Sequence, residues 1–571
     1  KYGVELPKSI KHSELLDRNS KSSLWSGALT KEMFNVGVAF EILEESQNIP
    51  VGWNKATGHL IWDVKIDGTR KARWVLDGHR TQDPEHSTYA GVVSRESVRI
   101  ALTYAALNDI DVNAADIRNA YLQAPTSEKH YIVCGLEFGL ENVGKRALIR
   151  RALYGGKSAG RDFRNHLREC MNMLHFKSCP ADPDVWMRPA TKSDGSKYWE
   201  YVLLYVDDVL IISEHGEAVL RGEIGKHFKL KEESIGPPSF YLGGKLRKVS
   251  LDNGTSAWAF GSSKYIQASV DNIELYLKNR NSKLPSRCNT PTSTNYRPEL
   301  DTSKECNPED ATHFQSLIGV LRWIVELGRV DICCEVSMLS SSLALPREGH
   351  LEQVYHIFAY LKKYHNAEMV FDPSDPGVEY ALFPKQDWSN TEFDQDEKEE
   401  IPQDMPETRG RGFVIRAYVD ADHAGDCLTR RSRTGFLVYL NSAPVYWSSK
   451  KQGSCETSTF GSEFMAMKQC CEYLRGLRYK LRMMGIPVDL PSFVFGDNQS
   501  VLYNTTLPDS TLKKKSLSIA YHFVREGACK DEWRTAYINT HLNPADLLTK
   551  PLPGSEKRMN FVRMVLHHLF G

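Results

Sequence analysis

The feature that most constrains this chain is a run of aromatic and β-branched residues, YWEYVLLYVDDVLIIS, from Tyr198 to Ser213. Such a composition predicts β-structure, and the adjacent acids Asp207 and Asp208 interrupt the run. We therefore expect a β-hairpin with both carboxylates at its tip. Successive strand residues point to opposite faces of a sheet, so one acid would bind a metal ion and the other would act from the flank. A solvated turn is the alternative interpretation, because Asp is common in turns.

A second acid of the same kind lies upstream. Asp116, in AADIRNAYLQAP, ends a plausible strand, and Tyr121 follows five residues later. Carboxylates from different strands can together hold two Mg²⁺ ions roughly 4 Å apart. Such ions would activate a 3′-hydroxyl and stabilise a leaving pyrophosphate.

The motifs around these acids carry a family resemblance. YVDD after an apolar run, with D-x4-Y upstream, resembles the palm motifs of reverse transcriptases. The blocks LWSGALTKEM, KARWVLDGH, RALYGGKSAGRDF, YLGGKL and FQSLIGVLRWIVELGRVDI resemble copia-type LTR-retrotransposon polyproteins, in the family's order and with similar gaps. The likeness covers most of residues 25–370.

The resemblance implies a role for each of these residues. Asp116 and Asp207 would bind the catalytic metals, with Asp208 beside them as the third acid of the site. Tyr121 would be the steric gate that rejects a 2′-hydroxyl, or else a core aromatic residue.

Further substrate contacts are implied by the KARWV and LYGG motifs. Lys71 and Arg73 would reach the incoming triphosphate, where fork and point charges suit phosphate; a solvated basic turn is the alternative. Gly155 would let backbone approach the nucleotide and template. The sequence departs from the family at Gly156, where a bulky apolar residue is usual, and at Gly160, which replaces Pro.

The C-terminal unit has its own set of acids. Alternating residues predict strands over 413–419, 435–440 and 444–448; apolar residues three or four apart predict a helix from Phe460 to Met484, which Gly485 would end. A short strand over 493–495 follows. The acids at the ends of these elements are Asp420, Glu463, Asp497 and Asp546. Each alone has an ordinary structural interpretation, such as a helix N-cap or a favourable interaction with a helix dipole.

All four acids together, in the order strand, helix, strand and final helix, resemble the retroelement RNase H domain over about residues 412–555. The resemblance implies that the quartet holds two metal ions, which position a water to cleave RNA in a hybrid. Asp422 is a lesser candidate for the place of Asp420, and His541 would help to release product.

Charge is balanced over the whole chain, with 72 basic and 72 acidic residues, but it is unevenly placed. Nine acids and one lysine lie between Asp387 and Glu407, which predicts a solvated linker. The remainder is mildly basic, which permits phosphate binding. Three basic clusters would track a hybrid backbone or form solvated faces: Arg430 to Arg433, Lys450 and Lys451, and Lys513 to Lys515.

These features predict an α+β and α/β multidomain chain, a right-hand polymerase followed by an RNase H-like domain. We expect fingers and palm over 1–285, a helical thumb or connection over 286–370, a connection and acidic linker over 371–411, and the RNase H-like domain over 412–571. Helices are expected at 314–325 and 350–364. The scattered cysteines predict reduced core residues, because no C-x2-C pair occurs.

The resemblance implies an RNA-directed DNA polymerase, also able to copy DNA, with ribonuclease H activity and Mg²⁺ (two per active site) or Mn²⁺ as cofactor. Its partners would be RNA template, DNA primer and product, RNA–DNA hybrid and dNTPs. No apolar run reaches 18 residues and no signal peptide is evident, so a cytoplasmic, particle-associated or nuclear protein without a membrane partner is expected. A first residue other than Met suggests a piece of a longer precursor.

Two alternatives stay open. A decayed or domesticated copy would bind nucleic acid without catalysis, although seven matching acids in two domains argue against decay. An integrase is disfavoured, because no His/Cys zinc module is present and the palm motifs would be unexplained.

Overall fold

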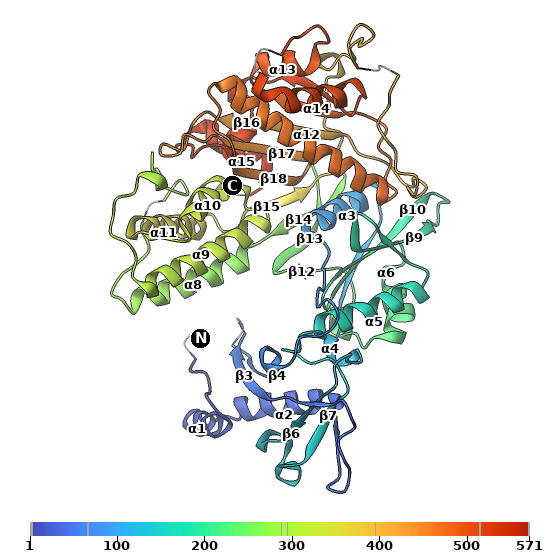
Figure 1. Ribbon diagram of the computed structural model, residues 1–571, viewed down its shortest axis with the longest axis vertical. Coiled ribbons are helices and arrows are strands. Elements are labelled where there is room, and N and C mark those ends of the chain that lie inside the picture. Colours follow the sequence, from blue (N-terminus) through green and yellow to red (C-terminus); the bar gives the residue numbers. More distant parts are fainter. Residues whose placement is uncertain are drawn as a thin grey trace.

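The computed structural model describes residues 4–65, 68–286, 288–293, 295–393, 396–512 and 515–568. Figure 1 shows the N-terminal elements at the foot of the molecule, a group of helices around α8 to α11 at one side, and the C-terminal elements at the top. In the part of the chain described, no helix combines the length and hydropathy that a membrane crossing needs.

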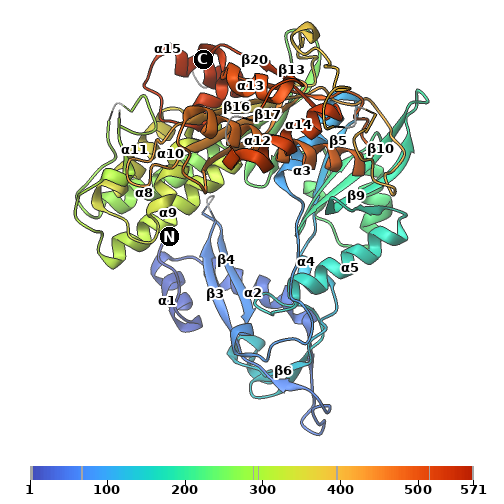
Figure 2. The same cartoon turned by 45° about the horizontal axis from the view of Figure 1, so that its top comes forward.

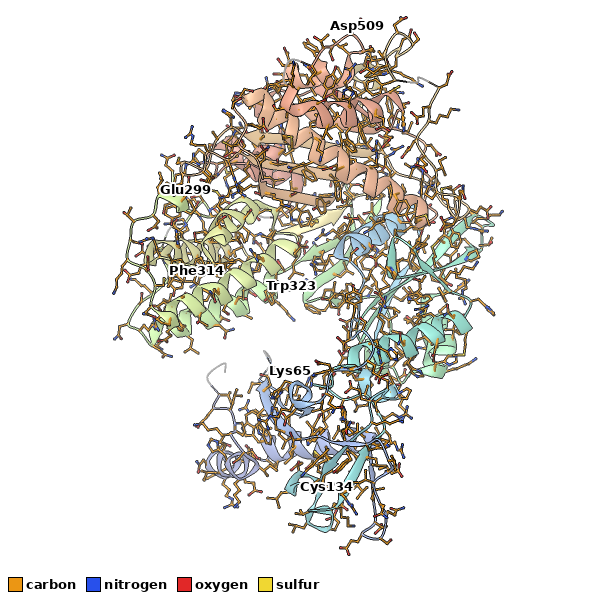
Figure 3. The ribbon with its side chains drawn as sticks, viewed as in Figure 1. Lys65, Cys134, Glu299, Phe314, Trp323 and Asp509 are labelled. Atoms are coloured by element: carbon orange, nitrogen blue, oxygen red, sulfur yellow. The ribbon has the colours of Figure 1, made fainter. Side chains whose placement is uncertain are left out.

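The N-terminal elements form a four-stranded sheet of order β1-β7-β6-β2 and a separate hairpin, β3–β4, on which α2 packs. Their bounds are α1 (Ile10–Ser20), α2 (Leu24–Val36), β1 (Phe40–Ile42), β2 (Asn54–Lys55), β3 (Gly58–Val64), β4 (Arg70–Leu76), β6 (His130–Val133) and β7 (Arg146–Ile149). Figure 3 labels Lys65 at the turn end of this hairpin and Cys134 just after β6.

A five-stranded antiparallel sheet of order β5-β11-β10-β9-β8 follows. The expected hairpin is confirmed: Tyr205 pairs with Asp208 at the end of β10 and β11, and only Val206 and Asp207 form the turn. The elements of this region are α3 (Arg95–Leu107), β5 (Val112–Asp116), α4 (Ala120–Gln123), α5 (Ala159–Met173), β8 (Lys177–Cys179), β9 (Asp182–Thr191), β10 (Lys197–Tyr205), β11 (Asp208–Ile212), α6 (Gly216–Val219) and α7 (Gly225–His227).

The third region combines a sheet of order β12-β13-β14-β15 with four helices. Asn307 caps α9 by accepting the N–H of Asp310, and Pro308 occupies the first helical position, where its missing N–H costs nothing. Both expected helices are present, as α9 and α11. The bounds are β12 (Phe240–Tyr241), β13 (Gly244–Ser250), β14 (Ser256–Gly261), α8 (Ser263–Lys278), α9 (Pro308–Glu326), α10 (Cys333–Leu339), α11 (Glu348–Lys363) and β15 (Glu368–Phe371).

The C-terminal sheet has the order β18-β17-β16-β19-β20. Strands β16, β17 and β18 are antiparallel, whereas β19 and β20 run parallel to β16. The long helix α12 ends at Met483, just before Gly485, whose φ of +69° suits a residue without Cβ. The bounds are β16 (Ile415–Asp422), β17 (Arg433–Leu440), β18 (Ala443–Lys451), α12 (Thr459–Met483), β19 (Ser492–Gly496), α13 (Gln499–Thr506), α14 (Ser518–Cys529), β20 (Trp533–Tyr537) and α15 (Glu556–Val565).

One hydrophobic core joins the last three regions. A single cluster of buried side chains extends from Val93 on the palm side to Leu566 near the C-terminus. Figure 2 shows α3 and α12 next to each other, and the two are linked by Tyr473, which donates to Glu96 at 2.7 Å. The palm-side sheet and the C-terminal sheet therefore share an interior. The boundaries at 285, 370 and 411 stay predictions.

The acidic stretch is not the solvated linker that its charge predicted. Glu399 forms ion pairs with Arg478 and Arg482 on α12, and Trp388 is buried. Aromatic side chains and paired arginines anchor the segment to the C-terminal helices. Asp394 and Gln395 lie outside the described residues.

The cysteines agree with the core interpretation. Among the described residues, none of the twelve cysteines forms a disulfide bond, and nine of them are buried.

Candidate functional site

The first candidate site lies at the tip of the β10–β11 hairpin. The register of β5 and β11 places Asp116 directly opposite Asp208, so their side chains leave the same face of the sheet. Asp207, in the turn, accepts the N–H of Ile117 through its carbonyl at 2.8 Å, which ties the tip to the end of β5. The sequence-predicted acids Asp116, Asp207 and Asp208 are therefore brought together.

Their electrostatics favour a bound cation. Burial, and then the charge of Asp116, raise the pKa of Asp207. Burial, Asp207 and Asp116 raise the pKa of Asp208 to about 6. The Oδ1 atom of Asp116 is buried without a hydrogen-bond partner. Crowded carboxylates with an open acceptor fit divalent cations, which prefer oxygen ligands.

Lys231 is a site residue that the sequence analysis missed. Its Nζ lies 2.5 Å from Oδ2 of Asp116, and its backbone N–H donates to the carbonyl of Asp116. The residue stands 115 positions further along the chain, so no local pattern linked the two. The one available signal was the basic FKLK segment in an otherwise unassigned stretch.

Tyr121, Lys71 and Arg73 lie beside the same acids. The guanidinium carbon of Arg73 stands 3.7 Å from the ring centre of Tyr154, which in turn lies 4.8 Å from the ring of Tyr121. Burial and then the charge of Asp207 raise the pKa of Tyr121. Burial and then Arg73 lower the pKa of Lys71. The β3–β4 hairpin thus presents cations to the palm acids.

The structure gives a reason for glycine at position 155 that the LYGG motif did not indicate. Its φ is +85°, and a Cβ atom there would stand 2.1 Å from the carbonyl oxygen of Leu76. The close approach in this structure is to the backbone of β4, where Leu76 bonds to Tyr154. Approach to a nucleotide stays a prediction.

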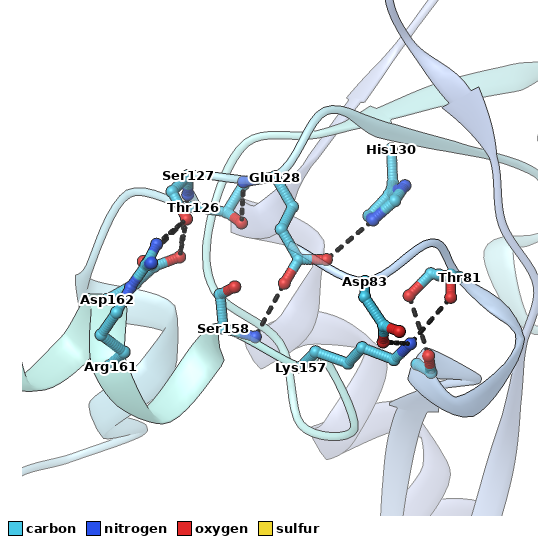
Figure 4. Close-up of polar contacts among 11 residues, drawn as sticks. Thr81, Asp83, Thr126, Ser127, Glu128, His130, Lys157, Ser158, Arg161 and Asp162 are labelled. Atoms are coloured by element: carbon cyan, nitrogen blue, oxygen red, sulfur yellow. Dashed lines mark hydrogen bonds and ion pairs between the residues drawn. The ribbon is translucent and has the colours of Figure 1, made fainter. Parts of the chain in front are cut away.

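The loop after Gly155 is held by polar contacts, which Figure 4 shows. Glu128 accepts from the backbone N–H of Ser158 at 2.7 Å and contacts His130 at 2.8 Å. Lys157 pairs with Asp83 at 2.7 Å. Gly160 packs toward Ala90, whose Cβ would stand 3.2 Å from an added Cβ. Of the two departures from the family, Gly156 therefore lies in a loop held by polar contacts, and Gly160 lies in the first turn of α5.

The second candidate site is a carboxylate triad in the C-terminal sheet. The parallel pairing of β16 with β19 ends at Val419 and Gly496, so the next residues, Asp420 and Asp497, emerge side by side. Glu463, one turn into α12, completes the set. One oxygen from each acid lies within 4.8 Å of the others, and among the described residues this is the one such group of three.

The acids of the triad repel one another. Burial, and then Asp420 and Asp497, raise the pKa of Glu463 to about 10. Burial and then Asp546 raise the pKa of Asp420. Oxygen donors this close, with this repulsion, fit one or two hard divalent cations.

Asp546 is close to Asp420, but its partners and its position differ from the expected metal ligand on the final helix. Its oxygens face Lys550 at 2.8 Å and Lys557 at 2.5 Å. It lies in the 3₁₀ helix Pro544–Leu548, not in the final α-helix, because Asn543 and Pro544 start a short tight turn. The two lysines were missed by the sequence analysis, although Lys550 stands four residues after Asp546.

The lesser candidates have other partners. Asp422 accepts the backbone N–H of Arg433, and His541 is exposed. Of the basic clusters, Arg430 and Arg431 are exposed, whereas Lys451 pairs with Asp426 at 2.6 Å.

Lys513 and Lys514 lie outside the described residues.

Comparison with known proteins addresses the polymerase region directly. Residues 41–285 match the family model described as reverse transcriptase (RNA-dependent DNA polymerase). The chain is 25% identical over 569 residues to a retrovirus-related Pol polyprotein from transposon TNT 1-94 of Nicotiana tabacum, covering 96% of this chain and 38% of that protein. It is 25% identical over 487 residues to the corresponding polyprotein from transposon RE1 of Arabidopsis thaliana, covering 84% of this chain and 29% of that protein. The chain thus spans about a third of the length of these relatives.

Two solved structures show more distant similarity. One is a foamy viral protease–reverse transcriptase in complex with double-stranded DNA, with a TM-score of 0.47 and 11% identity, covering 91% of this chain and 70% of that one. The other is an RNase H domain from Mycobacterium tuberculosis fused to maltose-binding protein, with a TM-score of 0.19 and 14% identity, covering 24% of this chain and 91% of that one.

The family match and the sheet topologies described above confirm the expected fold class, a right-hand polymerase followed by an RNase H-like domain. They also confirm the resemblance first indicated by the YVDD and D-x4-Y motifs. Residues 41–285 are a reverse transcriptase region, in a chain that resembles copia-type LTR-retrotransposon polyproteins over nearly all of its length.

Proposed function

We propose that this chain copies RNA, and then DNA, into DNA from a primer, and that its C-terminal domain degrades the RNA strand of the resulting hybrid. The observation that carries the proposal is the convergence of Asp116, Asp207 and Asp208 at a hairpin tip inside the family-matched region. Its partners would be the RNA template, the DNA primer and product, the hybrid and dNTPs.

The palm residues would act on the primer and the incoming nucleotide. When bound, two Mg²⁺ ions would activate the primer 3′-hydroxyl and stabilise the charge of the leaving pyrophosphate. Asp116 and Asp207 would hold them, Asp116 through its unpartnered Oδ1. Lys231 neutralises the other oxygen of Asp116, which keeps that side chain oriented.

The β3–β4 hairpin would receive the triphosphate. Arg73 is fixed by stacking on Tyr154, and Lys71 supplies a second positive charge beside it. Base pairing with the template would supply sequence specificity, so the protein needs to read only backbone and shape.

The C-terminal triad would act on the RNA strand. Asp420, Glu463 and Asp497 would hold the cations that position a water for attack on a phosphodiester. Asp546, neutralised by two lysines, would support Asp420 and complete the coordination when substrate is present.

The first test is Asp207→Asn. The substitution is nearly isosteric in a half-buried turn, so the fold should persist. Primer extension on an RNA template should fall at least about 100-fold, more than the cost of losing a supporting group around a metal. Extension near the wild-type rate would contradict the palm assignment. A wild type inactive on both substrates would favour a decayed nucleic-acid-binding copy.

The second test is Glu463→Gln. Cleavage of the labelled RNA strand of a hybrid should be abolished, because one ligand of the triad is neutralised, while primer extension continues at a similar rate. The apolar face of α12 is untouched, since Phe464, Met467 and Cys471 carry its packing. A variant that lost polymerase activity and kept nuclease activity would overturn the division of roles.

A further inference from the structure

A cavity of about 200 Å³ lies beside the C-terminal triad, between segments far apart in the sequence. Its wall includes Arg297 from the third region, Ser341 after α10, Arg431 from the β16–β17 connection and Arg433 at the start of β17. Thr549 also lines it, and the hydroxyl of Thr549 donates to Oδ2 of Asp420 at 2.5 Å. Thr549 therefore lies between the cavity and the triad and contacts both.

Contacts between the two segments hold the cavity together. Arg297 donates to the carbonyl of Gly425 at 3.0 Å, and Glu299 accepts the N–H of Cys427 at 3.1 Å. Figure 3 shows Glu299 on the side of the molecule where the third region meets the C-terminal elements. Both contacts use main-chain atoms of the β16–β17 connection, so they fix its path.

Within the described ranges, the guanidinium groups of Arg297, Arg431 and Arg433 form no ion pair within 4.0 Å, although Glu299, Asp422 and Asp426 also line the cavity. Lys451, by contrast, is paired with Asp426. Arg433 is only 8% exposed, and one end of its guanidinium donates to the hydroxyls of Ser337 at 2.7 Å and Ser449 at 3.3 Å.

A nearly buried guanidinium bonded only to neutral hydroxyls is costly, because desolvation is not offset by an opposite charge. Two acids interact electrostatically with the Arg433 guanidinium. They are Asp422, which accepts the backbone N–H of Arg433, and Glu335, whose pKa is raised by burial to about 7. Neither forms an ion pair with it. An anion that entered the cavity would supply the opposite charge at this guanidinium.

We infer that this cavity binds a phosphate group of the nucleic-acid strand engaged at the Asp420–Glu463–Asp497 triad. Planar guanidinium groups match phosphate oxygens, and Ser341 and Thr549 offer hydroxyl donors beside them. Because Arg297 comes from the third region, that region contributes directly to substrate grip at the nuclease site. The inference rests on the proposed nuclease function of the triad.

The experiment measures binding of a fluorescent RNA–DNA hybrid to the full chain from about 50 to 300 mM KCl, a range over which phosphate contacts are lost. The Glu463→Gln background prevents cleavage and is checked on a gel. Arg431→Gln and Arg297→Gln are the test variants. Arg433 is left intact, because its contacts with Ser337 and Ser449 also serve the fold. Arg430→Gln is the matched control: it is an exposed arginine of the same connection that does not line the cavity.

The inference expects each test variant to bind hybrid more weakly and to lower the slope of log affinity against log salt by about one, with Arg430→Gln unchanged. Equal losses in all three variants would mean a diffuse basic surface and would overturn it. A second outcome would also overturn it: pyrophosphate raises the melting temperature of wild type, Arg431→Gln abolishes this effect, and the salt slope of Arg431→Gln for hybrid is unaltered. The ligand of the cavity would then be a free anion.

The nuclease proposal fails separately. If wild type does not cleave hybrid but Arg431→Gln still lowers the slope, the phosphate site survives and the activity assignment does not. If wild type cleaves hybrid and the slope of Arg431→Gln equals that of the parent, the phosphate site alone is wrong.

Discussion

Tyr121 occupies a defined place among aromatic residues beside the palm acids. Its ring lies 4.8 Å from that of Tyr154 and 5.9 Å from that of Phe163, in tilted and edge-on arrangements that hold it firmly. The side chain is half-buried and within the field of Asp207. A rigid ring within the electrostatic influence of Asp207 suits the proposed steric gate against the 2′-hydroxyl, the group that marks RNA.

Replacing Tyr121 with Val should raise the ratio of ribonucleotide to deoxyribonucleotide incorporation, because the smaller side chain leaves room for the 2′-hydroxyl. Single-nucleotide extension with matched dNTP and rNTP measures this ratio. Tyr121→Phe is the control, since it keeps the ring and should keep the selectivity. An unchanged ratio in an active Val variant would reduce Tyr121 to a packing residue.

At the scale of residues, the acids could be predicted and their counterions could not. Asp207 and Glu463 stand at the ends of strongly patterned elements, so local sequence places them. Lys231 reaches Asp116 across 115 positions, and Lys557 reaches Asp546 from a helix that the pattern did not predict. Such partners depend on how distant segments meet. A glycine such as Gly155 is ambiguous for the same reason: its sequence indicates close approach but not what approaches.

Among the elements, the acidic segment before β16 is anchored to α12 mainly by a single carboxylate, that of Glu399, and its total charge matters less. Hydrogen bonds of 2.6 and 2.8 Å join Glu399 to Arg478, and Arg482 pairs with the same carboxylate. Although burial opposes it, these bonds from Arg478 and Arg482 lower the pKa of Glu399 to about 2. Both arginines are almost fully buried, so loss of the carboxylate would leave them unmatched.

We expect Glu399→Gln to lower the free energy of unfolding at neutral pH by about 2 kcal/mol, in the range for hydrogen bonds to charged groups. Because the folded pKa lies below the ordinary value of 4.5, the stabilisation is complete above that value and is lost as pH falls toward 2. The difference between wild type and variant in urea unfolding should therefore shrink between about pH 5 and pH 2.

Glu397→Gln is the control for this element. Glu397 pairs with Lys530 at 3.1 Å but is 55% exposed, so its loss should change stability little at any pH. Equal effects of the two substitutions, or a Glu399→Gln difference that grows on acidification, would contradict the anchoring role.

Periodic elements were predictable and the anchored segment was not. The strands β16 to β18 and the helix α12 have alternating or helical apolar patterns, which arise because one face must be buried. The segment from 383 to 407 has no such period: its anchor is a few separated side chains, Phe383 and Trp388 among them. Elements such as β20 and α15 were also missed, since each is short and completes a surface made by others.

On the scale of the whole molecule, the C-terminal domain depends on the rest of the chain for part of its interior. The guanidinium of Arg558, on α15, donates to the carbonyl of Asp331 at 2.9 Å and is almost fully buried. At the far end of α12, the hydroxyl of Tyr201 donates to the carbonyl of Met484. Separating the domain would expose both surfaces.

We therefore expect a fragment of residues 412–571 to melt about 10 °C or more below the full chain, or to aggregate, because a loss of several kcal/mol shifts Tm by this amount for a domain of this size. Circular dichroism during heating measures the difference. A fragment of residues 237–571 restores the Asp331 contact and should melt between the two. Equal melting of the short fragment and the full chain would show that the shared interior adds little.

The shared interior also sets an order of events during synthesis. Arg99, on α3, donates to the carbonyl of Val445 and stacks on Trp447, across 346 residues of chain. At translation speeds of about 5–20 residues per second, roughly 20–70 s separate the two partners. The face of α3 that carries Arg99 stays uncovered by β18 on the ribosome for that interval. Any factor that shields it, or any pause that prolongs the wait, would govern how much of the newly made protein reaches its native state.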